Sequence, residues 1–296
     1  LRSGARAEPN TRATTAELYD GLAATSQNRW PSLRRDALAI NGLFSPLLVA
    51  GFYYKTFMWP AALWERLYEP LIRRAAGLGA LSGLPDPDSY DCDHGFCDLL
   101  VIGAGPAGLA AALAAARGGA RGVLLGGECR PRGRLLAEAH EIDAMPGQVW
   151  ADAVLAELSA NPRVTVLART AVIGAYDGGV FAALERVSDH VPEPMPGQPR
   201  QRLWKIVARR SVLAAGAVER PLVFAGNDRP GVMMASAVQA YVRRWGVAPG
   251  RRMVFFTTCD SGWQAVRDVL AAGAAVDAIV EARANVSPAM RTMAGP

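Results

Sequence analysis

The stretch Leu99-Leu100-Val101-Ile102-Gly103-Ala104-Gly105-Pro106-Ala107-Gly108-Leu109 is an apolar segment followed by a glycine-rich turn and an alanine-rich segment. This order of strand, turn and helix is typical of a dinucleotide-binding unit, in which the pyrophosphate lies at the helix N-terminus. Gly103 permits the tight turn, Gly105 lets the backbone approach the pyrophosphate, and Gly108 lets the helix pack closely on the sheet. A purely structural glycine turn is the alternative. We expect six residues to contact the dinucleotide: Gly103, Ala104, Gly105, Pro106, Ala107 and Gly108.

A dinucleotide site of this kind also needs an acidic residue about 20 residues further on, where the second strand ends, to bind the adenosine ribose. Glu128 lies at this distance from Gly108 and is our candidate, with an ordinary surface glutamate as the alternative. Gly126 and Gly127 occupy positions where the acid could equally stand. The nearby Arg130 gives little support for a preference for a 2′-phosphate.

Two later turns bear on the same site. A strand ending in small residues precedes Ala215 and Gly216, where backbone can pass close to a bound dinucleotide, although an ordinary turn is an equal alternative. The segment 258–262 has helix-capping residues but no second GxGxxG, so we do not expect a second dinucleotide site there.

Strand and helix signals alternate from residue 98 onward, which predicts an α/β fold with a doubly wound parallel sheet. We expect a connector and the tail of a preceding module over 1–95, and a truncated FAD/NAD(P)-binding Rossmann-type domain over 96–296. The segment 192–199, with four prolines, predicts a surface connection. The expected strands are 98–102, 123–125, 164–167, 203–208, 211–215, 253–257 and 276–280, and the expected helices are 106–117, 149–159, 235–245 and 261–272.

The connector is rich in aromatic residues and is expected to be mainly helical. Seven aromatic side chains lie between Phe52 and Tyr68, and the apolar spacing over 61–76 predicts a helix with Pro60 at its start. These side chains either form part of this chain's own core or pack against another subunit.

The composition of the 296-residue chain is that of a folded protein, with 51% hydrophobic and 20% charged residues. The net charge is +5, but the arginines are scattered, so we expect no nucleic-acid role. No apolar run reaches the length of a membrane span, and four cysteines are too few for a disulfide scaffold, so we expect a cytoplasmic protein. Because the sequence begins at Leu1 instead of Met, we also expect it to be a fragment of a longer chain.

The sequence contains a cofactor motif but no recognisable catalytic group. No CxxC lies beside a βαβ unit, and neither His140 nor His190 belongs to a nucleophile motif. Cys92, His94 and Cys97 lie close together, but no second pair with ligand spacing accompanies them, so we expect no metal site.

Several blocks resemble the α subunit of heterotetrameric sarcosine oxidase and extend over nearly the whole chain. They are 25–33, 50–60, 142–147, 200–205, 219–224 and 227–233. The resemblance implies oxidation of sarcosine to glycine, with the one-carbon unit taken by tetrahydrofolate and electrons passing from flavin to O₂. It also implies a flavin-bearing β subunit with FAD, an FMN at the boundary of the subunits, and an NAD in this chain that does not turn over.

By the same resemblance, the dinucleotide loop of the family falls on Gly103, Gly105 and Gly108, and the acid falls on Glu128. Two departures stand out: Gly127-Glu128 replaces a pair of acids, and Ala214-Ala215-Gly216 replaces an Ala-Thr-Gly turn. Two other functions remain open, an FAD-binding subunit of a related amine or amino-acid dehydrogenase and a non-catalytic Rossmann scaffold.

Overall fold

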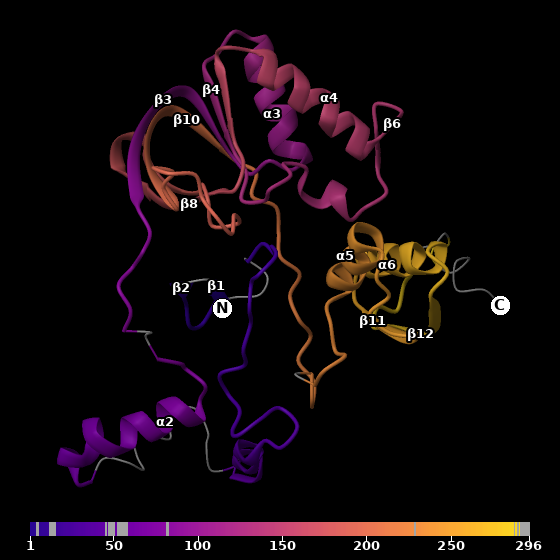
Figure 1. Ribbon diagram of the computed structural model, residues 1–296. Coiled ribbons are helices and arrows are strands. Elements are labelled where there is room, and N and C mark those ends of the chain that lie inside the picture. Colours follow the sequence, from indigo (N-terminus) through magenta and orange to yellow (C-terminus); the bar gives the residue numbers. More distant parts are fainter. Residues whose placement is uncertain are drawn as a thin grey trace. The chain divides into compact units, whose positions relative to one another are not determined.

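The computed structural model describes residues 1–3, 6–11, 16–44, 46, 51, 59–80, 83–227, 229–286, 288 and 290 (Figure 1). The chain forms two compact units. The first comprises Leu1–Asp91 and Arg186–Arg202, and the second comprises Cys92–Glu185 and Leu203–Pro296. The division into a connector at 1–95 and a Rossmann-type domain at 96–296 stays a prediction, because compactness does not identify where a domain boundary lies.

The first unit consists of short elements. Its helical stretch changes form along its length, because Pro70 has no N–H to donate to the carbonyl four residues earlier. Glu69 N instead bonds Trp64 O, which is the spacing of a π-helix. The expected helix over 61–76 is therefore present as three consecutive helical forms. The elements are β1 (Arg2–Ser3), β2 (Arg6–Ala7), η2 (Ala37–Phe44), η3 (Ala61–Leu63), η4 (Trp64–Tyr68) and α2 (Glu69–Ala75).

Four aromatic residues of the connector, Phe52, Tyr53, Tyr54 and Phe57, lie outside the described residues. Of the aromatic residues that are described, Trp59 is 85% exposed and its carbonyl accepts a hydrogen bond from Tyr68 Oη at 3.1 Å. The apolar side chains that follow at helical spacing, Leu63, Leu67 and Leu71, are also exposed. An apolar stripe therefore lies on the surface of this helical stretch.

One arginine joins distant parts of the first unit. The guanidinium of Arg200 pairs with the carboxylates of Glu8, Asp88 and Asp189. Burial alone would lower the pKa of Arg200, but the hydrogen bonds that its guanidinium donates to Asp189 and Glu8 raise it above its usual value. This cluster holds the segment 186–202 against the N-terminal part of the unit.

A six-stranded sheet forms the centre of the second unit, in the order β7-β4-β3-β10-β9-β8. β3, β4 and β7 are parallel, and β8 and β9 are antiparallel. β3 and β10 run in the same direction, since Asp98 pairs with Arg209 and Ile102 O accepts a hydrogen bond from Ala214 N. The predicted α/β class with a mostly parallel sheet is confirmed. The strands are β3 (Tyr90–Ile102), β4 (Gly122–Leu125), β7 (Val164–Leu167), β8 (Thr170–Tyr176), β9 (Val180–Arg186) and β10 (Gln201–Leu213).

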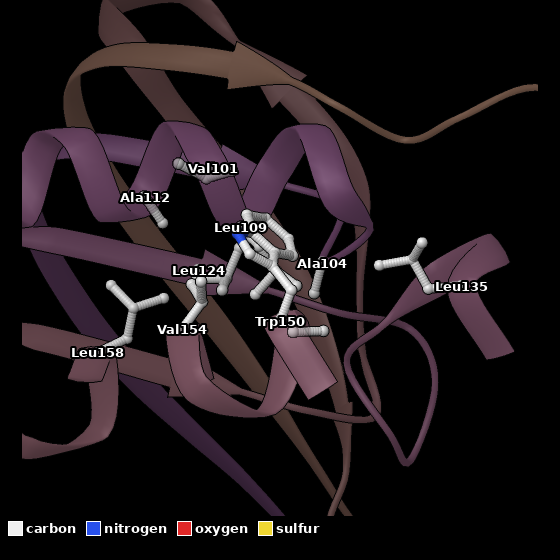
Figure 2. Packing of buried hydrophobic residues seen from close by; sticks show 10 residues of the cluster. Val101, Ala104, Leu109, Ala112, Leu124, Leu135, Trp150, Val154 and Leu158 are labelled. Carbon is white, nitrogen blue, oxygen red and sulfur yellow. The ribbon is translucent and has the colours of Figure 1, made fainter. Parts of the chain in front are cut away.

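Alternate residues of β3 enter two different cores. Leu99 and Val101 pack with α3 (Pro106–Arg117) and α4 (Gly147–Ala160), and Val101 belongs to the buried cluster of Figure 2 together with Leu109, Leu124, Trp150, Val154 and Leu158. Leu100 and Ile102 point into a second cluster with side chains of β9 and β10. β4 and the C-terminal half of β3 are thus buried on both faces, which is why they read as continuous apolar runs. Small elements between α3 and α4 are η5 (Gly133–Leu136), β5 (Glu141–Ile142) and β6 (Met145–Pro146).

The β8–β9 hairpin, joined by η6 (Asp177–Gly179), is absent from the sequence expectations. The two expected strands over 203–208 and 211–215 are a single strand, β10. The connection over 192–199 is confirmed, since it contains no helix or strand.

The C-terminal part of the second unit is a second strand-helix-strand arrangement. β11 (Arg252–Thr257) and β12 (Ala275–Glu281) are parallel and are joined by α6 (Asp260–Ala271), which packs on α5 (Ala235–Trp245). Within this apolar core the buried Asp268 carboxylate accepts hydrogen bonds from Gln239 and Arg243. Among the described helices, none combines the length and hydropathy that a bilayer crossing requires.

Candidate functional site

The turn after β3 has a geometry that only glycine adopts easily. Gly103 has φ of +109° and donates its N–H to Leu125 O at 2.9 Å. A Cβ at this position would lie 2.3 Å from the carbonyl oxygen of Ala214. The turn therefore needs both the left-handed conformation and the close approach of a neighbouring strand, as predicted for a tight turn.

Gly108 brings α3 into contact with this turn. A Cβ at Gly108 would lie 1.8 Å from the carbonyl oxygen of Gly103, which is far closer than any carbon-oxygen contact allows. The helix therefore starts directly over the end of β3. The first hydrogen bond within the helix runs from Leu109 N to Gly105 O at 2.9 Å, which leaves the amides of Ala107 and Gly108 without an acceptor inside the helix.

Gly105 stands at the start of the helix, close in sequence to these residues. A Cβ built on it would meet only Gly133 Cα, at an ordinary contact distance of 3.8 Å. Gly105 is the N-cap residue, and α3 has no side-chain cap that would cover its N-terminus. These residues fit a pyrophosphate, because the amides of Ala107 and Gly108 have no acceptor within the helix, the helix dipole is positive at this end, and no side-chain cap covers it.

Two further segments border the turn. Ala215 and Gly216 follow β10, and Ala215 N would lie 2.9 Å from a Cβ at Gly103, so this segment runs beside the turn. Gly216 has φ of +74°. Ala104 is buried, and a Cβ on Gly126 would touch its methyl group at 2.9 Å. The carboxyl ends of β3, β4 and β10 thus meet at the glycine turn, where ligands of α/β sheets bind.

Glu128 lies three residues beyond the end of β4, and its carboxylate is already engaged. Arg244 Nη2 of α5 lies 2.8 Å from Glu128 Oε2. The Arg244 guanidinium also lies over the Trp245 ring, 4.6 Å from its centroid. Sequence reasoning missed Arg244 because it lies 116 residues beyond Glu128 and no local motif marks it. It missed Gly133 because no local motif marks its contact with Gly105.

The loop before α6 repeats the shape of the first turn with different groups. A Cβ at Gly262 would lie 2.2 Å from Thr257 Oγ1, so α6 also begins close to its strand. Glu281, at the end of β12, accepts hydrogen bonds from Arg283 and Trp263, which lower its pKa to about 2. The polar groups at this end are paired with one another.

The cysteines and histidines do not form a catalytic constellation. None of the four cysteines forms a disulfide bond. A hydrogen bond with Ser261 lowers the pKa of the exposed Cys259 thiol, whereas burial raises that of Cys97. His140 Nε2 lies 2.9 Å from Glu138 Oε2. In the part of the chain that the structure describes, no three side chains of His, Cys, Asp or Glu gather as they would around a metal ion.

A sequence model described as pyridine nucleotide-disulphide oxidoreductase matches residues 97–248, which include the turn, Glu128 and Arg244. The chain belongs to this oxidoreductase family. The match is consistent with the geometry at the carboxyl ends of β3, β4 and β10.

Sarcosine oxidase α subunits match over 72% to 95% of this chain, so the predicted resemblance is confirmed. The subunit from Rhizobium meliloti (strain 1021) is 59% identical over 280 residues, which are 95% of this chain and 28% of that protein. The subunit from Corynebacterium sp. (strain P-1) is 45% identical over 74% of this chain and 23% of its own length. The chain therefore spans about a quarter of the length of these relatives.

More distant similarities extend to other oxidases and dehydrogenases. An opine oxidase subunit from Agrobacterium tumefaciens (strain Ach5) is 34% identical over 54% of this chain and 31% of that protein. Among solved structures, L-proline dehydrogenase from P. horikoshii superimposes with a TM-score of 0.53 and 23% identity, covering 64% of this chain and 36% of that chain. At this identity the structural match supports the fold alone.

Proposed function

We propose that this chain is the dinucleotide-binding part of the α subunit of a heteromeric, flavin-dependent sarcosine oxidase. The observation that carries this proposal is the 59% identity to a sarcosine oxidase α subunit over 95% of the chain. The whole protein would convert sarcosine, O₂ and tetrahydrofolate to glycine, methylenetetrahydrofolate and hydrogen peroxide. A partner β subunit would bear FAD, and FMN would complete the assembly.

The role proposed for this chain is to hold NAD. The amides of Ala107 and Gly108 would bind the pyrophosphate, Gly105 would leave room for it, and Ala215 and Gly216 would border the opposite side. Glu128 would accept hydrogen bonds from the ribose hydroxyls. Bound nicotinamide dinucleotides supply hydride-transfer chemistry, but the NAD proposed here does not turn over, so these residues only bind and orient it.

Identification of the released cofactor tests this role. The purified chain is denatured, and the supernatant is analysed by absorption spectroscopy and mass spectrometry. NAD in a near-stoichiometric amount supports the proposal. Release of FAD would favour the alternative, an FAD-binding subunit of an amine or amino-acid dehydrogenase, which the similarity to an opine oxidase supports. A chain that neither releases nor takes up added NAD or FAD would leave only a non-catalytic scaffold.

The proposed reaction is tested on the complete protein. The full-length α subunit is coexpressed with its neighbouring subunits, and sarcosine-dependent O₂ consumption is measured with and without tetrahydrofolate. Activity with sarcosine but not with opines or proline supports the assignment. Activity with another secondary amine and none with sarcosine would contradict it.

Glu128→Ala is expected to weaken NAD binding by roughly 1 to 3 kcal/mol, the scale of lost hydrogen bonds to a charged group, or about 5- to 150-fold in Kd. Isothermal titration calorimetry measures this change. Glu193→Ala, which removes an exposed carboxylate in the connection before β10, is the control and should leave Kd unchanged. An unaltered Kd for Glu128→Ala would transfer the ribose contact to another residue.

The chain of residues 1–296, expressed alone, is expected to self-associate through the exposed Trp59, the half-buried Trp64 and the apolar stripe that accompanies them. Burial of one such ring is worth about 2 to 3 kcal/mol, and several exposed apolar side chains together favour association. The double substitution Trp59→Ser and Trp64→Ser should restore a monomer in light scattering. Leu18→Ser, at an isolated exposed position, should not. A monomeric unmodified chain would show that this surface is no interface.

A further inference from the structure

The acid that is proposed to bind the ribose is half of an ion pair. Arg244 Nη2 donates to Glu128 Oε2 at 2.8 Å, and the Arg244 side chain is only 22% exposed. The other carboxylate oxygen of Glu128 has no hydrogen bond among the described residues. A carboxylate has about four acceptor positions, so Glu128 keeps the capacity to accept ribose hydroxyls while it binds Arg244.

Arg244 is held in place from several directions. It lies in the last turn of α5, where the negative end of the helix dipole stabilises a cation, and its guanidinium is over the Trp245 ring. The adjacent Arg243 donates to the buried Asp268 of α6, which fixes the rotation of α5 about its axis. The guanidinium is therefore a fixed part of the ribose end of the site.

The charge of this pair decides which adenosine ribose fits. A lone glutamate at the end of the second strand accepts hydrogen bonds from a 2′-hydroxyl and repels a 2′-phosphate, whereas a nearby arginine accommodates the phosphate. Here one carboxylate and one guanidinium stand together, so their net charge is zero. A guanidinium has five N–H donors, of which one is used by Glu128 in this structure.

We propose that Arg244 is a specificity-determining residue that allows this site to bind adenosine with a 2′-phosphate as well as adenosine with a free 2′-hydroxyl. The proposal rests on the proposed function, because it assumes that Glu128 faces the adenosine ribose. The class of ligand is a 2′-phosphorylated adenine dinucleotide, and Arg244 contacts its 2′-phosphate. Glu128 contacts the ribose when that phosphate is absent.

The test compares two probes that contain only the shared adenosine part, 5′-AMP and adenosine 2′,5′-bisphosphate, by calorimetry on chain stripped of bound nucleotide. The unmodified chain is expected to bind the bisphosphate within about threefold of 5′-AMP. Arg244→Gln should weaken the bisphosphate about tenfold or more and 5′-AMP less than threefold, because the lost contacts are charge-assisted. Glu128→Gln should strengthen binding of the bisphosphate.

Two further variants complete the design. Arg267→Gln removes one positive charge from an exposed position of α6 and should change neither affinity. Arg244→Lys keeps the charge but loses the planar fork, so its bisphosphate affinity should fall between those of the unmodified chain and Arg244→Gln. Because Arg244→Lys keeps the ion pair with Glu128, it separates loss of recognition from loss of local folding.

The outcomes separate this inference from the function on which it rests. Equal weakening of both probes by Arg244→Gln, or rejection of the bisphosphate by the unmodified chain more than 100-fold relative to 5′-AMP, would overturn the role of Arg244 and leave the dinucleotide site intact. An unmodified chain that binds neither probe, nor NAD or FAD, would overturn the proposed function itself.

Discussion

Gly105→Val is expected to abolish dinucleotide binding while the chain stays folded. The backbone at Gly105 is extended, with φ of −82° and ψ of −176°, a conformation that valine adopts readily. The new side chain would extend into the space above the Ala107 and Gly108 amides. Loss of two charge-assisted hydrogen bonds of about 1.5 kcal/mol each weakens binding about 100-fold or more.

Calorimetry with NAD and the thermal unfolding midpoint together measure this result. Gly105→Ala serves as the graded variant, since its Cβ meets only Gly133 Cα at 3.8 Å, and it should bind more weakly than the unmodified chain but more tightly than Gly105→Val. A valine variant that still copurifies with stoichiometric dinucleotide would place the cofactor elsewhere in the protein.

Gly108→Ala, in contrast to Gly105→Val, is expected to cause a large loss of folding stability. Its Cβ would lie 1.8 Å from Gly103 O and 3.0 Å from Gly103 C, so α3 must move away from β3. That movement disrupts the packing of Leu109 and Val101, two fully buried side chains. Overpacking costs about 1 to 3 kcal/mol where the surroundings can relax, and we expect about 3 kcal/mol or more where a backbone carbonyl is the obstacle.

Urea-induced unfolding followed by far-UV circular dichroism measures this loss. Gly127→Ala is the matched control, because a Cβ at Gly127 finds nothing within 4 Å and the residue does not have a positive φ. Its free energy of unfolding should change by less than about 1 kcal/mol. If both alanine variants were equally stable, the contact between α3 and the turn would be looser than the structure indicates.

Elements with strong local signals were predictable from the sequence. The helices over 106–117 and 235–245 and the strand over 164–167 have the predicted bounds. The first helix has proline in its first turn and an unbroken alanine-rich run, and the strand follows the turn-forming Asn161-Pro162. Such signals depend only on residues that are close in sequence, so they can be recognised without knowledge of the tertiary structure.

The β8–β9 hairpin escaped prediction for two physical reasons. Gly174 lies at a register irregularity in β8, so the alternation of side chains breaks there. β9 contains Ala182, Ala183, Leu184 and Glu185, which favour helix by propensity and form a strand only because they pair with β8 and β10. The Asp177-Gly178-Gly179 turn between them was the one local sign of a hairpin.

The residues of the candidate site likewise fall into those that could be predicted from the sequence and those that could not. Gly103 and Gly108 could be assigned their structural roles from spacing, because each role follows from the order of strand, turn and helix. Gly133 and Arg244 could not, because each reaches the site through tertiary contacts. Gly133 has φ of +54° and lies against Gly105, and Arg244 comes from a helix that packs on a different core. Sequence spacing does not indicate that Gly133 lies against Gly105 or that Arg244 reaches Glu128.

Helix α5 makes two contacts with other elements through adjacent residues. Arg243 reaches the buried carboxylate of Asp268, and Arg244 reaches Glu128, about 100° further around the helix. Both contacts depend on the same rotation of α5 about its axis. A substitution in α6 that removes the Asp268 contact would therefore turn Arg244 away from Glu128, even though α6 does not contact the nucleotide. In the course of evolution, Asp268 and Glu128 are then expected to be kept or lost together, although one is buried in α6 and the other is exposed after β4, 140 positions away.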